Sequence, residues 1–325
     1  MALPEGRRLD LGPRDHLQRL LARVPELCEI ADIDLVAPWN LDSSDVGPAH
    51  WQQLADAIAQ QFGAPNGPRC DGVVVIHGTD TMAYTASALA FMLRGLDRPV
   101  VLTGSQRPLE AWRTDARANL AAAVECATLD LPEVVVVFGD RVLRGCRATK
   151  VDANDYQAFD SPNEVPLGRI GVSVDLDKAR IRHNAQPFEL ARDLCSGVLG
   201  MTVFPGLDPS MLDGMLAQAQ GSVRVVLVRA FGMGNVPIQG DAGLVRAIGR
   251  LVARGTDVVV TTQCLRGRAQ LDLYPNGRAL LDVGAIGAGD MTFEAAATKA
   301  MWALGHPVRS VRGWFEADLA GEVGR

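Results

Sequence analysis

Short runs of β-branched residues alternate with helical patterns along most of this chain. The six runs are IDLVAP (33–38), GVVVIHG (72–78), RPVVLTG (98–104), EVVVVFG (133–139), VRVVLVRA (223–230) and TDVVVTTQ (256–263). The segments that we expect to be helical lie between them, at 49–62, 85–95, 114–129 and 243–255. Continuous apolar strands separated by helices are typical of a parallel sheet that is covered on both faces. The pattern therefore predicts an α/β protein with a doubly wound, mostly parallel sheet.

The alternation of strands and helices becomes irregular near the middle of the chain and then resumes. We place a linker at 181–195, between a larger N-terminal α/β domain at 1–180 and a smaller C-terminal α/β domain at 196–325. A length of 325 residues suits two domains of ordinary size, each with its own sheet.

The charge and the apolar runs exclude two classes of partner. The net charge is −6, and without a basic stripe the chain lacks the electrostatic footprint of a nucleic-acid binder. No apolar run approaches the roughly 20 residues that span a bilayer, and the first residues contain no apolar signal core. We therefore expect no nucleic-acid partner, no membrane partner and a cytoplasmic location.

Polar residues gather where four of the predicted strands end. In open parallel sheets, ligands bind beyond the carboxyl ends of the strands. The four segments are 37–45 with Asp42, Ser43 and Ser44, then HGTDT (77–81), TGSQRP (103–108) with Ser105, and 138–163, which has no clear regular structure in the pattern. Each of these hydroxyls and carboxylates is also a good helix N-cap, so any one of them alone indicates a cap as readily as a site.

Thr79, Asp80 and Lys150 form the most informative combination in these segments. Only three of the 32 basic residues are lysines, so arginine is the usual choice where charge alone matters, and a lysine amine can lose its proton when desolvated. A hydroxyl nucleophile needs a nearby base, and an amine oriented by a carboxylate can be that base. Thr79, Lys150 and Asp80 are therefore a candidate catalytic triad, and Ser43 and Asp80 can equally hold a zwitterionic substrate.

Two glycine-rich segments are weaker signals. GAIGAGD (284–290) lacks the Lys-Ser/Thr of a phosphate loop, and we interpret it as a turn into a helix capped by Asp290. FGMGN (231–235) fits a plain turn or a close approach to a ligand or a neighbouring subunit. No G-x-G-x-x-G follows an early strand, which argues against a nucleotide-binding fold.

Several of these motifs together resemble the bacterial L-asparaginases, specifically the cytoplasmic type I group. The resemblance rests on NLDSSD, DGVVVIHGTDTMAYTASALAFML, PVVLTGSQRP, RTDARANL, VFGDRVLRGCRATKVDANDYQAFDSPN, FPGLDPSML, RAFGMGNVP, TTQCLRG and GAIGAGDMTFEAAATKAMWALG. It covers nearly the whole chain from about residue 16 onward. It implies the two-domain asparaginase fold and hydrolysis of L-asparagine to L-aspartate and ammonia with no cofactor and no metal.

The resemblance also implies roles for the polar residues. The family uses two threonines. Thr79 corresponds to the one that forms the Thr-Lys-Asp catalytic group with Lys150 and Asp80, and the other threonine is the family's usual candidate for nucleophilic attack on the amide. The implied substrate contacts are Asp42, Ser43, Ser44, Thr79, Asp80, Ser105 and Asn235. Of these, Ser43 and Asp80 take the α-carboxylate and α-ammonium, and Asn235 belongs to a segment that reaches a neighbouring subunit's site. Self-association as a homodimer or homotetramer is expected on the same ground.

The first residues depart from the family pattern. Family members open with a strand that ends T-G-G-T-I-G-M and carries the other catalytic threonine, and nothing here matches it. We expect Met1 to take the place of that motif's methionine, and residues 1–27 to hold the lid remnant and the first helix. On this expectation the chain as written has little activity, and restoring the strand recovers it.

Two alternatives to an asparaginase stay open on the sequence. A non-catalytic asparagine-binding protein, or a degenerate homologue, would fit the missing first strand. The amidase subunit of a tRNA-dependent amidotransferase shares the fold, but it would normally carry an additional N-terminal domain.

Overall fold

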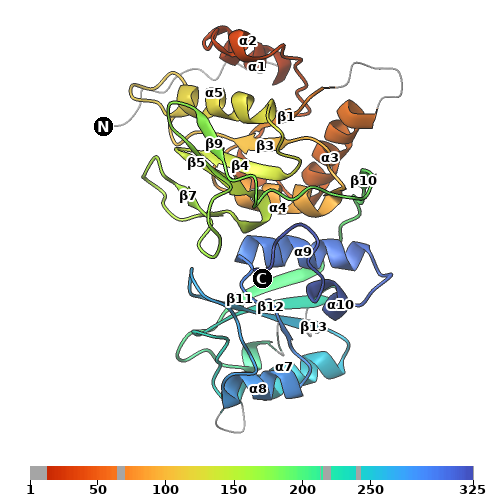
Figure 1. Cartoon of the computed structure of the whole chain (residues 1–325). Helices are drawn as coiled ribbons and strands as arrows, with labels where there is room; N and C mark the ends of the chain where they lie inside the picture. Colours follow the sequence, from red (N-terminus) through yellow and green to blue (C-terminus); the bar gives the residue numbers. More distant parts are fainter. Residues whose placement is uncertain (1–12, 64–69, 213, 215–220, 239–242, 325) are drawn as a thin grey trace.

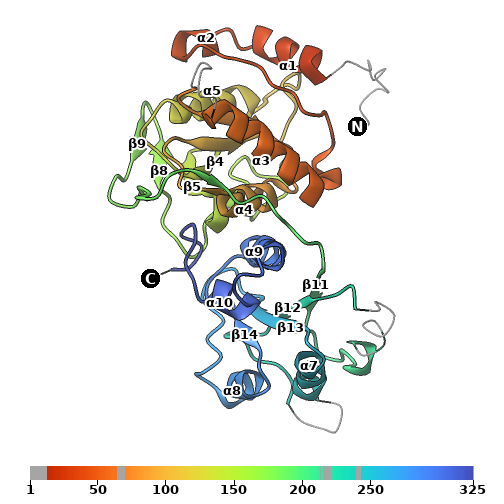
Figure 2. The same ribbon diagram turned by 90° about the vertical axis from the view of Figure 1, so that its right-hand side faces the viewer.

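A computed structural model describes residues 13–63, 70–212, 214, 221–238 and 243–324 (Figure 1). These residues build two main β-sheets, one in each half of the chain, and helices lie on both faces of each sheet (Figures 1 and 2). The predicted α/β class is therefore confirmed.

The first sheet contains six strands in the order β1-β3-β4-β5-β8-β9. They span Val73–Ile76 (β1), Val100–Thr103 (β3), Val134–Phe138 (β4), Arg141–Arg144 (β5), Gly168–Ile170 (β8) and Val174–Leu176 (β9). Strands β1, β3 and β4 are parallel, and the later neighbours are antiparallel. The apolar side chains of β3 and β4 are buried on both faces, which explains why these runs are continuous in the sequence.

Helices on opposite faces cover the parallel part of this sheet. Helices α3 (Pro48–Gly63) and α4 (Met82–Met92) lie on one face, and α5 (Ala116–Ala127) lies on the other (Figure 1). Two short helices, α1 (Pro13–Ala22) and α2 (Leu27–Ile30), lie outside α5, where Val24 and Leu27 pack against Leu120 and Val124.

The second sheet is fully parallel and joins the first half through a helix-to-helix contact. Its strands are β11 (Val198–Thr202), β12 (Val225–Ala230), β13 (Asp257–Thr262) and β14 (Ile286–Gly287). Helices α9 (Phe293–Gly305) and α10 (Val311–Phe315) lie on the side facing the first half, and α7 (Leu244–Ala253) and α8 (Pro275–Asp282) lie on the far side (Figure 2). Helix α4 packs against α9, so that Phe91, Leu227 and Trp302 belong to one core that spans both halves.

Two small antiparallel ribbons complete the described structure. Strand β10 (Glu189–Leu190) pairs with β2 (Leu93–Arg94), which ties the segment between the two main sheets to the end of α4. Strand β6 (Thr149–Lys150) pairs with β7 (Phe159–Asp160). Two single 3-10 turns, η1 (Ser43–Asp45) and η2 (Gly145–Arg147), lie before α3 and β6.

Two predictions about regular structure were wrong. Residues 33–38 form no strand, because a strand needs a hydrogen-bonded neighbour and no described strand pairs with this segment. The segment 138–163 is not irregular, since it contains β5, β6 and β7. Phe138 pairs with Arg141 across Gly139 and Asp140, and Gly139 has a φ of 60°. This two-residue connection turns the chain back and makes β5 antiparallel to β4.

The predicted helix cap at Asp290 was also wrong. Helix α9 begins at Phe293, and its cap is Thr292, whose side-chain oxygen accepts from the Ala295 N–H at 3.1 Å. Asp290 lies before this cap and binds Arg147 in the first half of the chain.

The expectation about Met1 and a lid remnant at the start of the chain lies outside the described residues. Among the helices that the structure does describe, none combines the length and the apolar character needed to cross a membrane.

Candidate active site

The polar ends of β1 and β3 meet at one edge of the first sheet. Ile76 pairs with Thr103, and the His77 N–H donates to the Thr103 carbonyl at 2.8 Å. A Cβ on Gly104 would lie 2.1 Å from the His77 carbonyl oxygen, so the two loops approach too closely for any side chain there. The HGTDT and TGSQ segments therefore lie against each other, as the parallel arrangement predicts.

Lys150 brings together the three residues of the candidate triad. Its Nζ lies 2.8 Å from the hydroxyl oxygen of Thr79 and 2.7 Å from Oδ1 of Asp80. The Lys150 side chain keeps 20% of its surface exposed and that of Asp80 keeps 68%. The three groups thus form a cluster at the surface, open to a small molecule, in which the amine contacts both a hydroxyl and a carboxylate.

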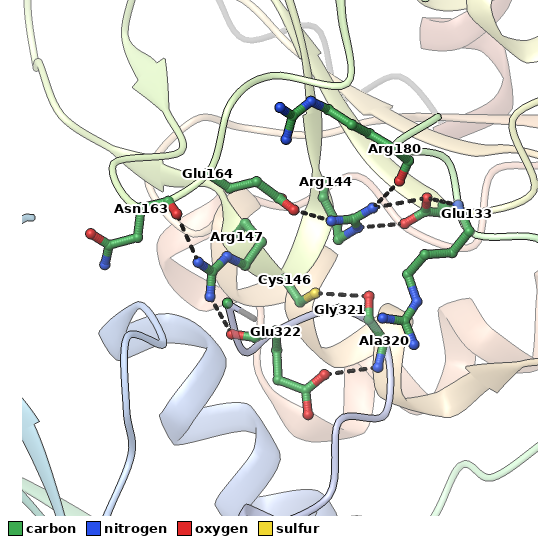
Figure 3. Close-up of polar contacts among 12 residues, drawn as sticks. Glu133, Arg144, Cys146, Arg147, Asn163, Glu164, Arg180, Ala320, Gly321 and Glu322 are labelled. Carbon is green, nitrogen blue, oxygen red and sulfur yellow. Dashed lines mark hydrogen bonds and ion pairs between the residues drawn. The ribbon is translucent and has the colours of Figure 1, made fainter. Parts of the chain in front are cut away.

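A buried polar network fixes the chain just before Lys150 (Figure 3). Arg144 donates to Glu133 at 2.6 Å, and Arg147 donates to Asp290 at 2.7 Å and to the Asn163 carbonyl at 3.1 Å. Arg144 directly precedes η2, Arg147 ends it, and η2 leads into β6. Because a buried charge without its partner is strongly unfavourable, these contacts determine the path of the backbone that carries Lys150.

The network also includes the C-terminal segment. Arg147 donates to the Glu322 carbonyl, and the Cys146 thiol contacts the Ala320 carbonyl at 3.4 Å (Figure 3). Burial alone would raise the pKa of Asp290, but hydrogen bonds from Arg147 and from the Gly324 N–H hold that pKa below its usual value. Asp290 is therefore ionised in the folded protein.

The loop before α3 reaches the same site. Ser43 is buried, with 6% of its surface exposed, and a Cβ on Gly78 would lie 2.6 Å from its hydroxyl oxygen. The Thr81 hydroxyl donates to the Ser43 carbonyl at 2.6 Å. Asp42 caps η1 and accepts from the backbone N–H and the hydroxyl of Ser44. The structure thus brings Ser43 against the HGTDT turn, with Asp42 and Ser44 exposed beside it.

Gln106 is a site residue that the sequence reasoning missed. The Thr79 hydroxyl donates to its Oε1 at 3.3 Å, and its Nε2 donates to the Asp155 carbonyl at 3.1 Å. Asp115 holds this turn by accepting from the backbone N–H groups of Gln106 and Arg107. The candidate Ser105 is half-buried in the same turn. The available signal was the TGSQ motif, which places a glutamine directly after Ser105.

Buried Asn119 supports the site from the adjacent helix. Its side chain donates to the Gly104 carbonyl at 2.9 Å and accepts from the Gly139 N–H at 3.1 Å. It thereby links the ends of β3 and β4, and its spacing of four residues from Asp115 puts both side chains on one face of α5.

Asn235 lies apart from this cluster. It closes a tight turn in the second half, where its N–H donates to the Phe231 carbonyl at 2.8 Å. Its contacts within the described ranges do not include Thr79, Asp80 or Lys150. Within these same ranges, the structure contains no group of three or more His, Cys, Asp or Glu side chains arranged to hold a metal ion.

Comparison with protein families gives two matches in chain order. Residues 5–182 match the model "Asparaginase, N-terminal", and residues 198–314 match "Glutaminase/Asparaginase C-terminal domain".

Individual relatives cover nearly the whole chain. L-asparaginase 1 of Escherichia coli is 36% identical over 95% of this chain and 90% of its own length. A glutamyl-tRNA(Gln) amidotransferase component of Pyrococcus abyssi is 34% identical over 96% of this chain and 71% of its own length. Among solved structures, the thermostable L-asparaginase from Thermococcus kodakarensis superimposes with a TM-score of 0.85 at 33% identity, covering 100% of this chain and 95% of that one. L-asparaginase I from Vibrio cholerae gives 0.83 at 35% identity, with coverage of 95% and 92%.

Proposed function

The chain belongs to the asparaginase family of amidohydrolases, and we propose that it hydrolyses the side-chain amide of L-asparagine to give L-aspartate and ammonia. One observation supports this activity above the others. Lys150 Nζ lies within 2.8 Å of the Thr79 hydroxyl and 2.7 Å of the Asp80 carboxylate, at the edge of the sheet where a ligand is expected.

In the proposed first step, the Thr79 oxygen attacks the amide carbon of asparagine. Its proton passes to the amine of Lys150, which serves as base in its neutral form. The C–N bond then breaks, and the nitrogen leaves as ammonia with the proton returned by Lys150. An ester between Thr79 and the aspartyl group remains.

Water completes the reaction by the same groups. It attacks the ester carbon, gives a proton to Lys150 and releases aspartate, and the Thr79 oxygen recovers that proton. The sum is one asparagine and one water converted to one aspartate and one ammonia. No redox step or cofactor is required.

Gln106 and Asp80 orient the reacting groups in this proposal. Before the reaction, the Lys150 ammonium donates to Thr79 and the Thr79 hydroxyl donates to Gln106 Oε1; in the reacting form, the neutral amine of Lys150 accepts the Thr79 proton instead. Asp80 accepts from Lys150 through Oδ1 and remains largely exposed. Because a charge-assisted hydrogen bond is about twice as strong as a neutral one, Asp80 holds the amine beside the hydroxyl.

The substrate's α-groups would lie over the loops that meet at this edge. We assign the α-carboxylate and α-ammonium to Ser43 and Asp80, with Asp42, Ser44 and Ser105 as neighbouring contacts.

Asn235 would contribute from a second copy of the chain in a homodimer or homotetramer. We also place the enzyme in the cytoplasm.

Ammonia release distinguishes this proposal from a non-catalytic asparagine-binding protein. We expect slow but measurable release from L-asparagine by the chain as written, weaker release from L-glutamine, and loss of both in Thr79→Ala and Lys150→Met. Binding of asparagine without release, seen by calorimetry, would overturn the enzyme and support a binding protein. Release that requires an added partner protein and glutamyl-tRNA would instead support the amidotransferase class represented among the relatives.

A further inference from the structure

His77 lies between the end of β1 and the turn that carries Thr79. The ring Nδ1 is 2.7 Å from the carbonyl oxygen of Gly78, and Nε2 is 2.9 Å from the hydroxyl oxygen of Thr85 on α4. A carbonyl oxygen only accepts hydrogen bonds. The contact with Gly78 therefore requires the proton on Nδ1, which leaves Nε2 of a neutral ring as an acceptor.

The contacts of Thr85 are compatible with this assignment. Trp51 on α3 lies with its Nε1 3.0 Å from the Thr85 hydroxyl oxygen, and an indole N–H only donates. The Thr85 oxygen thus accepts from Trp51, and because the Gly78 contact leaves His77 Nε2 without a proton, the Thr85 hydroxyl donates to that nitrogen. Trp51 keeps 4% of its surface exposed and Thr85 keeps none, so solvent does not compete with these bonds.

The ring sits in surroundings that favour its neutral form. Burial lowers the pKa of His77, and the hydrogen bond to the Gly78 carbonyl opposes that shift only in part.

We propose that His77 is a positioning residue, whose Nδ1-protonated ring holds the Gly78 carbonyl and thereby orients the peptide that leads into Thr79. The peptide bond is planar, so fixing the Gly78 carbonyl also fixes the Thr79 N–H and the direction of its Cα. The positioning role rests on the proposed function of Thr79, but the protonation state of the ring does not.

Gly78 is the residue in this turn that most needs such a restraint. A side chain is excluded there because a Cβ would lie 2.6 Å from the Ser43 hydroxyl oxygen. A glycine has greater backbone freedom than any other residue. The His77 ring restrains this peptide from one end, and the Thr81 hydroxyl fixes the other end of the turn on the Ser43 carbonyl.

Nitrogen NMR of protein labelled with ¹⁵N-histidine tests the protonation state directly. At pH 8 we expect the His77 ring, assigned by its loss in His77→Gln, to carry its proton on Nδ1. His50 is the internal control, because its Nδ1 accepts from the Gly47 N–H at 3.2 Å and its proton is expected on Nε2. A His77 ring protonated on Nε2 would overturn the proposal whether or not the protein is an asparaginase.

Thr85 variants test the consequence for catalysis. Thr85→Val removes the hydroxyl, and Thr85→Ser keeps it. We expect Thr85→Val to lower kcat about tenfold with KM within about twofold of wild type, and to give a mixture of ring tautomers at His77. Thr85→Ser should restore both the rate and the single tautomer, which a loss of packing alone does not predict.

The tautomer measurement and the kinetics of the Thr85 variants distinguish failure of the positioning role from failure of the proposed function. Equal kcat and a single His77 tautomer in both Thr85 variants would overturn the positioning role. If wild type releases no ammonia, the proposed function fails, and the tautomers of His77 and His50 still decide whether the ring holds the Gly78 carbonyl.

Discussion

Lys150 Nζ lies 2.8 Å from the Thr79 hydroxyl oxygen although the two residues are 71 positions apart in the sequence. The contact joins the turn after β1 to the ribbon formed by β6 and β7. Since Lys150 also contacts Asp80, one amine links the groups that the proposed reaction uses. The following predictions test this arrangement.

Two variants of Lys150 distinguish its role as a proton acceptor from its role as a positive charge. Lys150→Arg keeps the positive charge but cannot accept a proton at working pH, and Lys150→Met removes both properties. We expect both variants to lower kcat by at least about 100-fold, with thermal melting unchanged within a few degrees. A Lys150→Arg variant with near-wild-type kcat would show that charge alone is needed.

Replacing Gln106 removes the side chain that accepts a hydrogen bond from the Thr79 hydroxyl. Gln106→Met keeps the length of the side chain and loses its hydrogen bonds to Thr79 and Asp155. We expect kcat to fall about five- to tenfold, as the loss of one hydrogen bond of about 1 kcal/mol implies. Arg107→Ala is the control, since the side chain of Arg107 is removed while its backbone bond to Asp115 stays. Equal kcat values for the two variants would exclude a role for Gln106.

Alanine variants of Gly78 and Gly47 test whether the close approach of Gly78 to Ser43 affects the binding of asparagine. A Cβ on Gly78 would lie 2.6 Å from the Ser43 hydroxyl oxygen, whereas a Cβ on Gly47 meets no atom within 4 Å. Gly78→Ala should therefore displace Ser43 and raise KM for asparagine about tenfold, which is about 1.4 kcal/mol of binding. Gly47→Ala should leave KM unchanged. If both variants raise KM equally, the Ser43 contact is not what the substitution disturbs.

The ion pair between Arg147 and Asp290 leads to a prediction about the free energy of unfolding at acidic pH. Burial raises the pKa of Asp290, but the hydrogen bonds from Arg147 and Gly324 outweigh it and hold the folded-state pKa below the ordinary 3.8. A group with a depressed folded-state pKa contributes stability above its unfolded pKa, and that contribution is lost as the pH falls through the folded value. The free energy of unfolding, measured with urea at pH 6, 4 and 3, should therefore fall more steeply below about pH 4 in wild type than in Asp290→Asn.

Asp272 provides the control for this measurement, because it is an exposed aspartate outside the network. Asp272→Asn should follow the wild-type pH dependence. Identical acid profiles for wild type and Asp290→Asn would show that the pair does not carry this stability.

The parallel core could be predicted because its sequence signal is local. The runs at β3, β4, β12 and β13 are continuous valine-rich segments, which burial on both faces requires. The meeting of HGTDT with TGSQ follows from the carboxyl-end rule for parallel strands. The chemistry of Thr79, Asp80 and Lys150 and the rarity of lysine single them out in the sequence, and the structure places them in contact.

The errors arose where distant contacts decide the structure. Arg144 is buried in β5 only because Glu133 and Glu164 pair with it, and a charged residue at a strand position gives no strand signal in the sequence. Asp290 looked like a cap because its partner Arg147 is 143 positions away. The strand expected at 33–38 has apolar residues but no described neighbour with which to pair.

Ammonia release from L-asparagine by Thr79→Ser and Thr79→Val tests the proposed chemistry most directly. Serine keeps a hydroxyl beside Lys150, and valine keeps the volume without it. We predict that Thr79→Ser retains a measurable part of the wild-type kcat, while Thr79→Val loses at least about 100-fold and still binds asparagine. Release by Thr79→Val at the wild-type rate would contradict the assignment of the Thr79 hydroxyl as the reacting group.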